Sequence, residues 1–202
     1  MIRTVLLTTV AAILLAGPVL AAALIFTRGV PRALGRLLDD SKQLTAAQRQ
    51  EAFAALQLAR AAGRVEYAIA AASAAEIGSI NILQATYLAM QRAVARLPSR
   101  PDVALIDGNR APALPCRTVC IVDGDALSLS IAAASILAKV MRDRAMVRLC
   151  ARWPAYGFSS HMGYASRGHR AALEAHGPCP HHRRGFASVE AAYSRVRLSI
   201  AP

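Results

Sequence analysis

An uncharged run near the start of the chain limits what the chain can fold into. Val5–Phe26 holds 22 consecutive residues without a charged side chain. Its length suits a transmembrane helix, or a signal peptide with small residues for cleavage at Leu20–Ala23. The pair Gly17-Pro18 interrupts the run, and a proline inside a helix removes a hydrogen bond and clashes with the preceding turn. Two buried strands joined by a bend fit the same run, because a fully buried strand need not alternate polar with apolar residues.

The composition favours a folded protein that binds a polyanion. The chain has 202 residues, of which 55% are hydrophobic and 18% charged, so it can bury a core and is not intrinsically disordered. Arginine and lysine total 24 against 12 acidic residues, which gives a net charge of +12. This excess favours nucleic acid or an anionic membrane surface as a partner, although an arginine-rich proteome would give the same balance.

The cysteines give no sign of a disulfide framework. Four cysteines at irregular spacings in a chain of this length predict ordinary thiols in a reducing compartment, and hence a cytoplasmic protein. A zinc site can be drawn, but its C-x3-C spacing is loose and no second compact pair follows. Its ligands would be Cys116, Cys120, Cys179, His181 and His182.

Strands and helices alternate along the rest of the chain. This order predicts an α/β domain at residues 1–152 and a small helical C-terminal extension at 153–202, with Pro154 and Gly157 breaking the chain between them. The predicted helices span about Thr45–Ala61, Ile80–Leu97, Leu129–Ala151 and Ser166–Gly177, and the predicted strands span Arg64–Ala70, Val103–Ile106 and Thr118–Val122.

Two aspartates lie where strands are predicted to end. Asp107 follows a buried strand, and Asp125 follows the next strand just before a helix. Ligands of open α/β sheets bind at the carboxyl ends of the strands, and carboxylates there suit a hard divalent cation that binds phosphate oxygens and activates water. The alternative is local, with Asp107 forming only a turn before Gly108-Asn109 and Asp125 serving only as a helix cap.

A series of short motifs follows the chain from about Ala16 to Val189. They are Asp40-Ser41-Lys42 with Leu44, Asn81–Thr86, Leu88–Val94, Ile106–Arg110, Gly124-Asp125, Ala133–Val140 with Arg142-Asp143, Tyr156–Phe158 with His161, Gly163 and Tyr164, and His182–Arg184 with Phe186. In this order, the motifs resemble the ribonuclease HII family, the type 2 ribonucleases H. Gln43 stands where that family has a second lysine.

The resemblance implies a fold and an activity. The fold is α/β, a mixed five-stranded ribonuclease H-like sheet flanked by helices, with a helical C-terminal extension. The activity is that of an endonuclease that cleaves the RNA strand of RNA–DNA hybrids and nicks DNA beside single embedded ribonucleotides. Four carboxylates hold Mn2+ or Mg2+ in such enzymes, and Asp107 and Asp125 match two of them, which implies catalytic and metal-binding roles for both.

The same resemblance implies contacts to the substrate. Lys42, Asn109 and Arg110 lie in motifs that are implied to bind the nucleic acid. Tyr164 matches the tyrosine that stacks on the sugar of the ribonucleotide and helps to sense its 2′-hydroxyl, the group that distinguishes RNA from DNA.

The first strand departs from the family pattern. Thr8 and Thr9 stand where the other two catalytic carboxylates belong, and Ala11–Ile13 replaces a Gly-Arg-Gly loop that contacts the substrate near the scissile phosphate. Half of the metal cage is therefore missing, which predicts little or no cleavage. A catalytically silent nucleic-acid-binding homologue is one alternative to an active enzyme, and a membrane-anchored or exported protein is another.

These observations lead to structural expectations. Val10–Phe26 is predicted to form two adjacent strands of the sheet, with Thr8 and Thr9 near the two aspartates and no insertion into a membrane. The chain is expected to be a monomer that binds an RNA–DNA hybrid or a ribonucleotide-containing DNA duplex. Its contacts are expected to go mainly to phosphates, with Arg183 and Arg184 among them.

Overall fold

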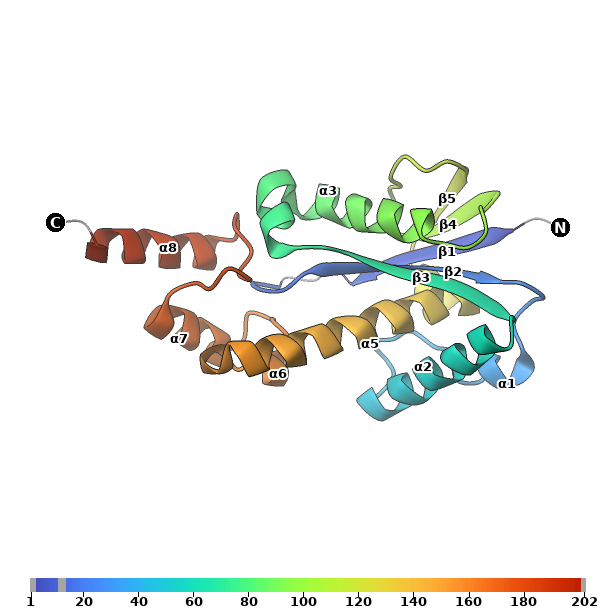
Figure 1. The fold of residues 1–202 in the computed structure, drawn as a ribbon, viewed down its shortest axis with the longest axis horizontal. Helices are drawn as coiled ribbons and strands as arrows, with labels where there is room; N and C mark the ends of the chain where they lie inside the picture. The colour runs from blue at the N-terminus through green and yellow to red at the C-terminus, as the bar shows by residue number, and fades with distance from the viewer. Residues whose placement is uncertain (1–2, 11–13, 201–202) are drawn as a thin grey trace. The chain divides into compact units, whose positions relative to one another are not determined.

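The uncharged run forms two paired strands and no helix. The computed structural model describes residues 3–10 and 14–200, with the side chains of all of these except residues 9, 10, 126 and 196–200. β1 (Thr4–Val10) and β2 (Val19–Phe26) lie antiparallel, with Leu6 opposite Leu24 (Figure 1). The prediction that both strands lie within Val10–Phe26 is wrong for the first strand: β1 starts at Thr4 and ends at Val10, because its first residues also pair with another strand of the sheet. Ala11–Ile13, which replace the family's Gly-Arg-Gly loop, lie outside the described residues.

The turn before β2 requires glycine. Gly17 has φ +86°, in the left-handed region that disfavours side chains. A Cβ atom at this position would also lie 2.4 Å from the sulfur of Met146. Gly17-Pro18 therefore forms a turn that leads directly into β2. Among the described residues, no helix combines the length and the apolar character needed to cross a bilayer.

Five strands form one mixed sheet in the described chain. β3 (Val65–Ala72), β4 (Val103–Asp107) and β5 (Arg117–Ile121) complete it, in the order β3-β2-β1-β4-β5. β1 is parallel to β4, β4 is parallel to β5, and β1 is antiparallel to β2. Because β2 is a central strand, all of its residues except Phe26 are buried, which explains why the run does not alternate. The predicted five-stranded mixed sheet is confirmed.

Helices account for most of the remaining chain. Thr45 caps the helix that follows it, as the sequence predicted. Its hydroxyl accepts from the Gln48 N–H, and the Gln48 side chain in turn accepts from the Thr45 N–H. The helices are α1 (Arg32–Gly35), α2 (Ala46–Ala61), α3 (Ala74–Ala95), α4 (Gly124–Leu127), α5 (Leu129–Arg152), a 3-10 turn (Pro154–Tyr156), α6 (Phe158–His161), α7 (Arg167–His176) and α8 (Ala187–Ile200).

Helix α3 begins earlier than predicted. Ser73 and Glu76 cap it, because the Ser73 hydroxyl accepts from the Glu76 N–H while Glu76 Oε2 accepts from the Ser73 N–H. Asn81, at φ +67°, then kinks the helix near the predicted start. The Ser-x-x-Glu spacing is the sequence signal for this earlier start.

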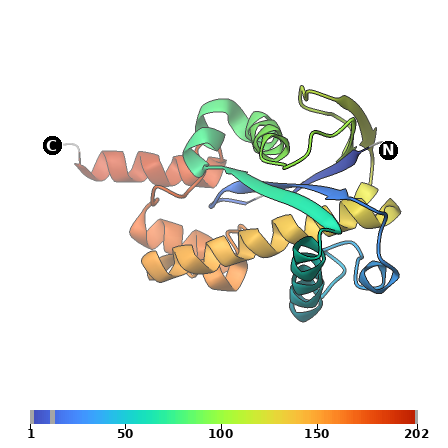
Figure 2. The ribbon, with the colours of Figure 1, turned by 45° about the vertical axis from the view of Figure 1, so that its right-hand side comes forward.

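Helices cover both faces of the sheet. Figures 1 and 2 show α2 and the first half of α5 on one face and the second half of α3 on the other. On the first face, Phe53 and Leu56 of α2 and Ile136 of α5 pack with Leu6 and Leu24 of the sheet. Burying an aliphatic or aromatic side chain of this size stabilises the fold by about 1.5–3 kcal/mol.

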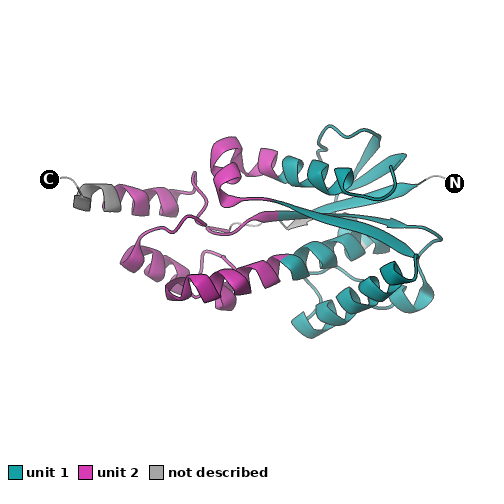
Figure 3. Ribbon diagram, viewed as in Figure 1, with its two compact units in different colours: residues 1–10, 20–71, 86–141 teal, residues 11–19, 72–85, 142–202 magenta. Residues whose placement is uncertain are grey.

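The chain divides into two compact units (Figure 3). Unit 1 contains residues 1–10, 20–71 and 86–141, and unit 2 contains residues 11–19, 72–85 and 142–202. Helices α3 and α5 each contribute residues to both units. The domain boundary between residues 152 and 153 stays a prediction.

Candidate metal and nucleic-acid site

Asp107 ends strand β4 at the carboxyl edge of the sheet. Because β1 and β4 are parallel and Leu7 lies opposite Ile106, the next residues, Thr8 and Asp107, are also neighbours. Thr8 Oγ1 donates a hydrogen bond of 3.2 Å to Asp107 Oδ2. The side chain of Thr9 lies outside those described. The predicted proximity of Thr8 to Asp107 is therefore observed.

Gly124 ties the second aspartate to the first. Its N–H donates to Asp107 Oδ1 at 3.1 Å, and the next residue, Asp125, is only 7% exposed. A Cβ atom at Gly124 would lie 2.6 Å from Cδ1 of Ile131. The motif Gly-Asp therefore needs a glycine, because the backbone must approach both the core and the Asp107 carboxylate.

The two aspartates interact electrostatically. Burial raises the pKa of Asp107, and the negative charge of Asp125 raises it further. Hydrogen bonds from Gly124 and Thr8 and the charge of Lys42 oppose this shift, but the pKa stays above its usual value. A bound cation would stabilise both charged carboxylates and lower the pKa again.

Lys42 is the cation that meets this pair in the structure. Its Nζ lies 3.3 Å from Asp125 Oδ2. The Lys42 N–H donates to Asp40 Oδ1 at 2.9 Å, and the Ser41 hydroxyl lies 2.6 Å from that of Ser135 on α5, so the turn is fixed to the domain. Burial lowers the pKa of Lys42, yet the charge and hydrogen bond of Asp125 raise it more, so the net shift is upward. The Lys42 side chain is 78% exposed, so the ion pair adds little stability.

The oxygen atoms at this site suit one hydrated ion better than two. Among the described side chains, Asp107, Asp125 and Thr8 offer oxygen donors here, and no cluster of three or more His, Cys, Asp or Glu side chains occurs in that part of the chain. Mg2+ requires octahedral oxygen coordination. Two ions about 3.5–4 Å apart need several carboxylates between them. The donors present therefore do not fit a two-metal centre.

Asn109 and Arg110 extend from the same edge. They lie in the loop after β4, where Gly108, at φ +124°, turns the chain and its N–H donates to the Ile121 carbonyl at 2.9 Å. Both side chains are exposed. Unit 1 therefore places Asp107, Asn109 and Arg110 next to one another, as their positions in the sequence require.

Tyr164 belongs to unit 2 and is described with it. Its side chain is 42% exposed. The Tyr164 carbonyl accepts from His169 Nδ1 at 2.8 Å, its N–H donates to the His161 carbonyl at 2.8 Å, and it forms a β-bridge with Leu14. The backbone around this tyrosine is thus held at three points while its ring side is open to solvent.

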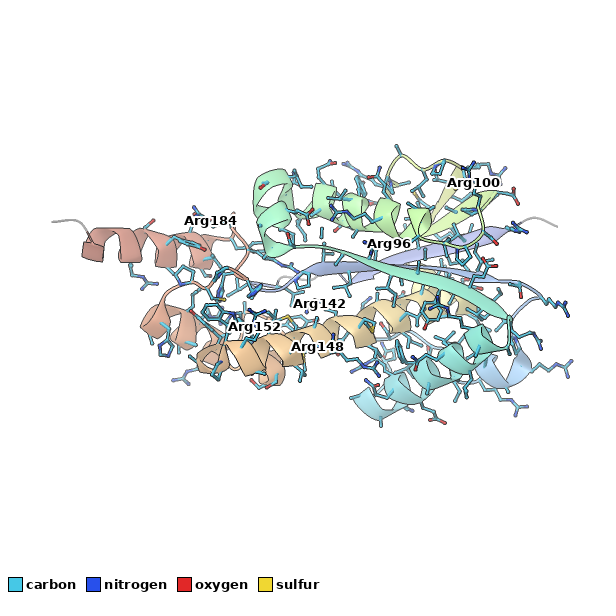
Figure 4. All side chains as sticks on the ribbon, viewed as in Figure 1. Arg96, Arg100, Arg142, Arg148, Arg152 and Arg184 are labelled. Carbon is cyan, nitrogen blue, oxygen red and sulfur yellow. The ribbon has the colours of Figure 1, made fainter. Side chains whose placement is uncertain are left out.

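Arg183 does not have the predicted role of a surface phosphate contact. It is completely buried, and its guanidinium donates to the Gly17 carbonyl at 2.8 Å and the Pro18 carbonyl at 3.1 Å. Burial, and next the charge of Arg142, lower the pKa of Arg183 to about 9. Arg184, labelled in Figure 4, is exposed, but its guanidinium makes two hydrogen bonds of 2.7 and 2.8 Å to Glu190. The prediction for Arg183 was wrong because its partners are backbone carbonyls, which a pattern of side chains does not reveal.

Comparison with known proteins identifies the family. The sequence model described as Ribonuclease HII matches residues 14–189. The chain belongs to the ribonuclease HII family. As a member of this family, it is an endonuclease of the ribonuclease H type. It is 57% identical over 176 residues to the ribonuclease HII of Granulibacter bethesdensis, covering 87% of this chain and 79% of that protein. The family match starts after Thr8 and Thr9.

Solved structures share this fold. Ribonuclease H2 from Pyrococcus horikoshii OT3 aligns with a TM-score of 0.81 at 20% identity, over 97% of this chain and 99% of that one. Bst-RNase HIII in complex with Mn2+ aligns with a TM-score of 0.70 at 17% identity, over 98% of this chain and 71% of that one. The chain therefore has a ribonuclease H fold.

Two supporting residues were missed from the sequence. Ser135 is a buried polar residue in a run of buried alanines, and such a residue usually signals a hydrogen bond, here to Ser41. His169 is completely buried at the third position after the helix cap Ser166, where it bonds to the Tyr164 carbonyl. A polar residue in an apolar setting is the signal in both cases.

Proposed function

We propose that the chain binds RNA–DNA hybrids and DNA that contains single ribonucleotides, and that it cleaves them as a ribonuclease HII-type endonuclease at a strongly reduced rate. The observation that supports this is the Asp107 and Asp125 pair at the strand ends, where the neutral hydroxyl of Thr8 bonds to Asp107. Two carboxylates and a neutral hydroxyl give a hard cation fewer charged ligands than four carboxylates do.

Asp107 and Asp125 would hold a single Mn2+ or Mg2+ ion. When bound, such an ion supplies an activated water and stabilises negative charge on a phosphate. The chain's own groups prepare for this, since the Gly124 N–H and the Thr8 hydroxyl each fix one oxygen of Asp107. Lys42 neutralises Asp125 in the absence of an ion.

Exposed side chains would contact the nucleic acid. Lys42 and Arg110 carry the charge to bind phosphates, and Asn109 can donate to a phosphate or sugar oxygen. Tyr164 offers an aromatic face and a hydroxyl to a sugar, which suits recognition of the ribonucleotide. We place this function in a cytoplasmic monomer.

Binding without cleavage is the second candidate. The Lys42 ammonium pairs with Asp125 Oδ2, an oxygen that could otherwise bind a metal ion. This pairing favours a protein that binds the duplex but does not cut it. The two candidates differ only in turnover, so a cleavage assay separates them.

The decisive experiment restores the missing carboxylates. A duplex with one ribonucleotide is incubated with Mn2+ and either the natural chain or the Thr8→Asp/Thr9→Glu variant. We expect the variant to cut faster by roughly two orders of magnitude or more, because charged ligands complete the cage. Adding Asp107→Asn to the variant should abolish cleavage.

Equal cleavage by the natural chain and the restored variant would contradict the proposal. It would mean that Thr8 and Thr9 do not align with the catalytic pair and that other carboxylates, Asp123 or Asp143, complete the site. Binding is tested separately, without metal, by comparing the affinities of Tyr164→Ala and the natural chain for hybrid and all-DNA duplexes. The variant should lose preference for the ribonucleotide.

A further inference from the structure

Unit 2 contains a hollow that the nuclease site does not use. Its volume is about 330 Å3, within the size range of pockets that bind small ligands or single side chains. The hollow lies between the last turns of α5, the start of α3 and the segments before β2 and after α7. It is lined by Pro18, Ser73, Ala74, Ala145, Arg148, Leu149, Arg152 and His181.

The walls of this hollow combine apolar surface with positively charged side chains. Pro18, Ala145 and Leu149 supply apolar surface. Arg148 and Arg152 are both exposed, one helical turn apart on α5 (Figure 4). Among the side chains that the structure describes, none forms an ion pair or hydrogen bond with either guanidinium. Like charges at this spacing repel each other, so a bound anion would stabilise the pair.

Acidic groups are absent from the described lining of the hollow, and the charge behind it is also positive. Glu76 meets the lining residue Ser73, but its Oε2 already accepts from the Ser73 N–H and hydroxyl. On the other side, buried Arg183 donates to the Pro18 carbonyl, and its Nη1 has no hydrogen-bond acceptor. A carboxylate in the hollow would therefore meet an uncompensated positive field.

His181 acts as a neutral wall. Burial lowers the pKa of His181, and the charge of Arg152 lowers it further. Its ring lies edge-on to Trp153, with centroids 6.4 Å apart. The hollow therefore offers two cations at its rim and apolar or neutral surface elsewhere.

We propose that this hollow binds an acidic peptide segment of a partner protein, with an apolar side chain between Pro18, Ala145 and Leu149 and a carboxylate on Arg148 and Arg152. A guanidinium pairs well with a carboxylate through two parallel hydrogen bonds. A nucleic-acid backbone binds exposed cations through its phosphates but has no apolar group to bury against these walls. The apolar walls therefore favour a peptide over a phosphate backbone. This site is independent of the proposed nuclease function.

The test uses the full chain and three labelled peptides. The first peptide alternates aspartate with leucine and phenylalanine, the second replaces aspartate by asparagine, and the third replaces the apolar residues by serine. Fluorescence anisotropy measures binding. The single tryptophan, Trp153, gives a second readout because it contacts His181 on the wall of the hollow. Only the first peptide should bind tightly and change the Trp153 emission.

Charge reversal locates the binding. Arg148→Glu and Arg152→Glu should each weaken binding of the first peptide by about tenfold, the loss expected for a charge-assisted contact. Arg170→Glu is the matched control, because Arg170 is an exposed arginine of α7 outside the hollow. It should leave binding and Trp153 emission nearly unchanged. Thermal unfolding verifies that all three variants fold.

Three results would overturn the proposal. Equal binding of the asparagine or serine peptide would show that charge or apolar contact is not required. Equal weakening by Arg170→Glu would show general attraction to a basic protein. A short DNA duplex that displaces the peptide, changes the Trp153 emission and depends on Arg148 and Arg152 would identify the hollow as a nucleic-acid site.

Discussion

His169 and His182 share a hydrogen bond between their Nε2 atoms, 3.1 Å apart, and both side chains are buried. His182 Nδ1 accepts from the Cys179 N–H, so its proton is on Nε2. His169 Nδ1 faces the Tyr164 carbonyl, which can only accept, so His169 is protonated on Nδ1 and accepts through Nε2. The network therefore assigns one neutral tautomer to each ring, and a chain of three hydrogen bonds leads to the backbone of Tyr164.

This pair predicts a loss of stability in acid. Burial, and next the charge of His169, lower the pKa of His182 to about 4, and burial also lowers the pKa of His169. Below about pH 6.5 a histidine in the unfolded chain binds a proton, whereas the buried histidine stays neutral, so acid favours unfolding. The loss attributable to His182 should develop between pH 6.5 and about 4 and reach on the order of 3 kcal/mol. Urea unfolding at several pH values measures it.

A matched variant separates this effect from the carboxylates, which also titrate in acid. His182→Gln retains an N–H that can donate to His169 but cannot take up a proton in this range. We expect the variant to be less stable than the natural chain at pH 7, and to lose less stability on acidification. An unchanged pH dependence in the variant would show that His182 is not the group responsible.

Lys42 should compete with metal ions for Asp125. Replacing it in Lys42→Met removes the ammonium 3.3 Å from Asp125 Oδ2, so we expect Mn2+ to bind several-fold more tightly in calorimetric titrations at pH 8. The same variant should bind duplexes more weakly, because it lacks a phosphate contact. Arg36→Met, which removes an exposed charge at the end of α1, serves as the control. Equal Mn2+ affinity in all three proteins would contradict the competition.

Arg110 should contribute to the salt dependence of duplex binding. Each phosphate contact releases counterions, so Arg110→Ala should reduce the slope of log affinity against log salt by about one. Arg184→Ala should change the slope less, since that guanidinium is already paired with Glu190. Anisotropy titrations between about 50 and 200 mM salt test both variants. Equal slopes for Arg110→Ala and the natural chain would place Arg110 outside the interface.

Local patterns predicted the elements whose signals lie within a few residues. The cap at Thr45, the stop at Gly177 and the strand that delivers Asp107 were all readable, because each depends on neighbouring residues. The start of β1 was not, because a fully buried strand has no alternation to mark its ends. The resemblance to ribonuclease HII supplied the number of strands and the mixed character of the sheet, and the structure supplied their order.

Long-range contacts explain what the patterns could not give. Arg183 looks like a surface residue in a segment rich in histidine and arginine, yet it bonds to carbonyls at residues 17 and 18. Carbonyls are present at every position, so no residue type indicates which of them will meet a buried arginine. Lys42 and Asp125 likewise meet across 83 residues, and only the resemblance grouped them.

Gly124 should control both the packing and the carboxylate of the candidate site. In Gly124→Ala, the new Cβ would lie 2.6 Å from Cδ1 of Ile131, a side chain that is completely buried and has little room to move. We expect a loss of about 1–3 kcal/mol in the free energy of unfolding, the usual cost of overpacking a core. The hydrogen bond from the Gly124 N–H to Asp107 Oδ1 lowers the pKa of that carboxyl. The same displacement would lengthen this bond and weaken its effect. Without this bond the pKa of Asp107 should rise further, and Mn2+ should bind more weakly, because the carboxylate loses the N–H that holds its Oδ1 in place.

Gly168→Ala provides the control for this prediction, because a Cβ atom at Gly168 meets no atom within 4 Å and the residue lies in α7. That variant should be as stable as the natural chain, or more stable by up to about 1 kcal/mol through helix propensity. Urea unfolding and calorimetric Mn2+ titration, applied to both variants, compare the two glycines directly. If Gly124→Ala were as stable as Gly168→Ala and bound Mn2+ equally well, the close approach of α4 to Ile131 and Asp107 would have no role in forming the site.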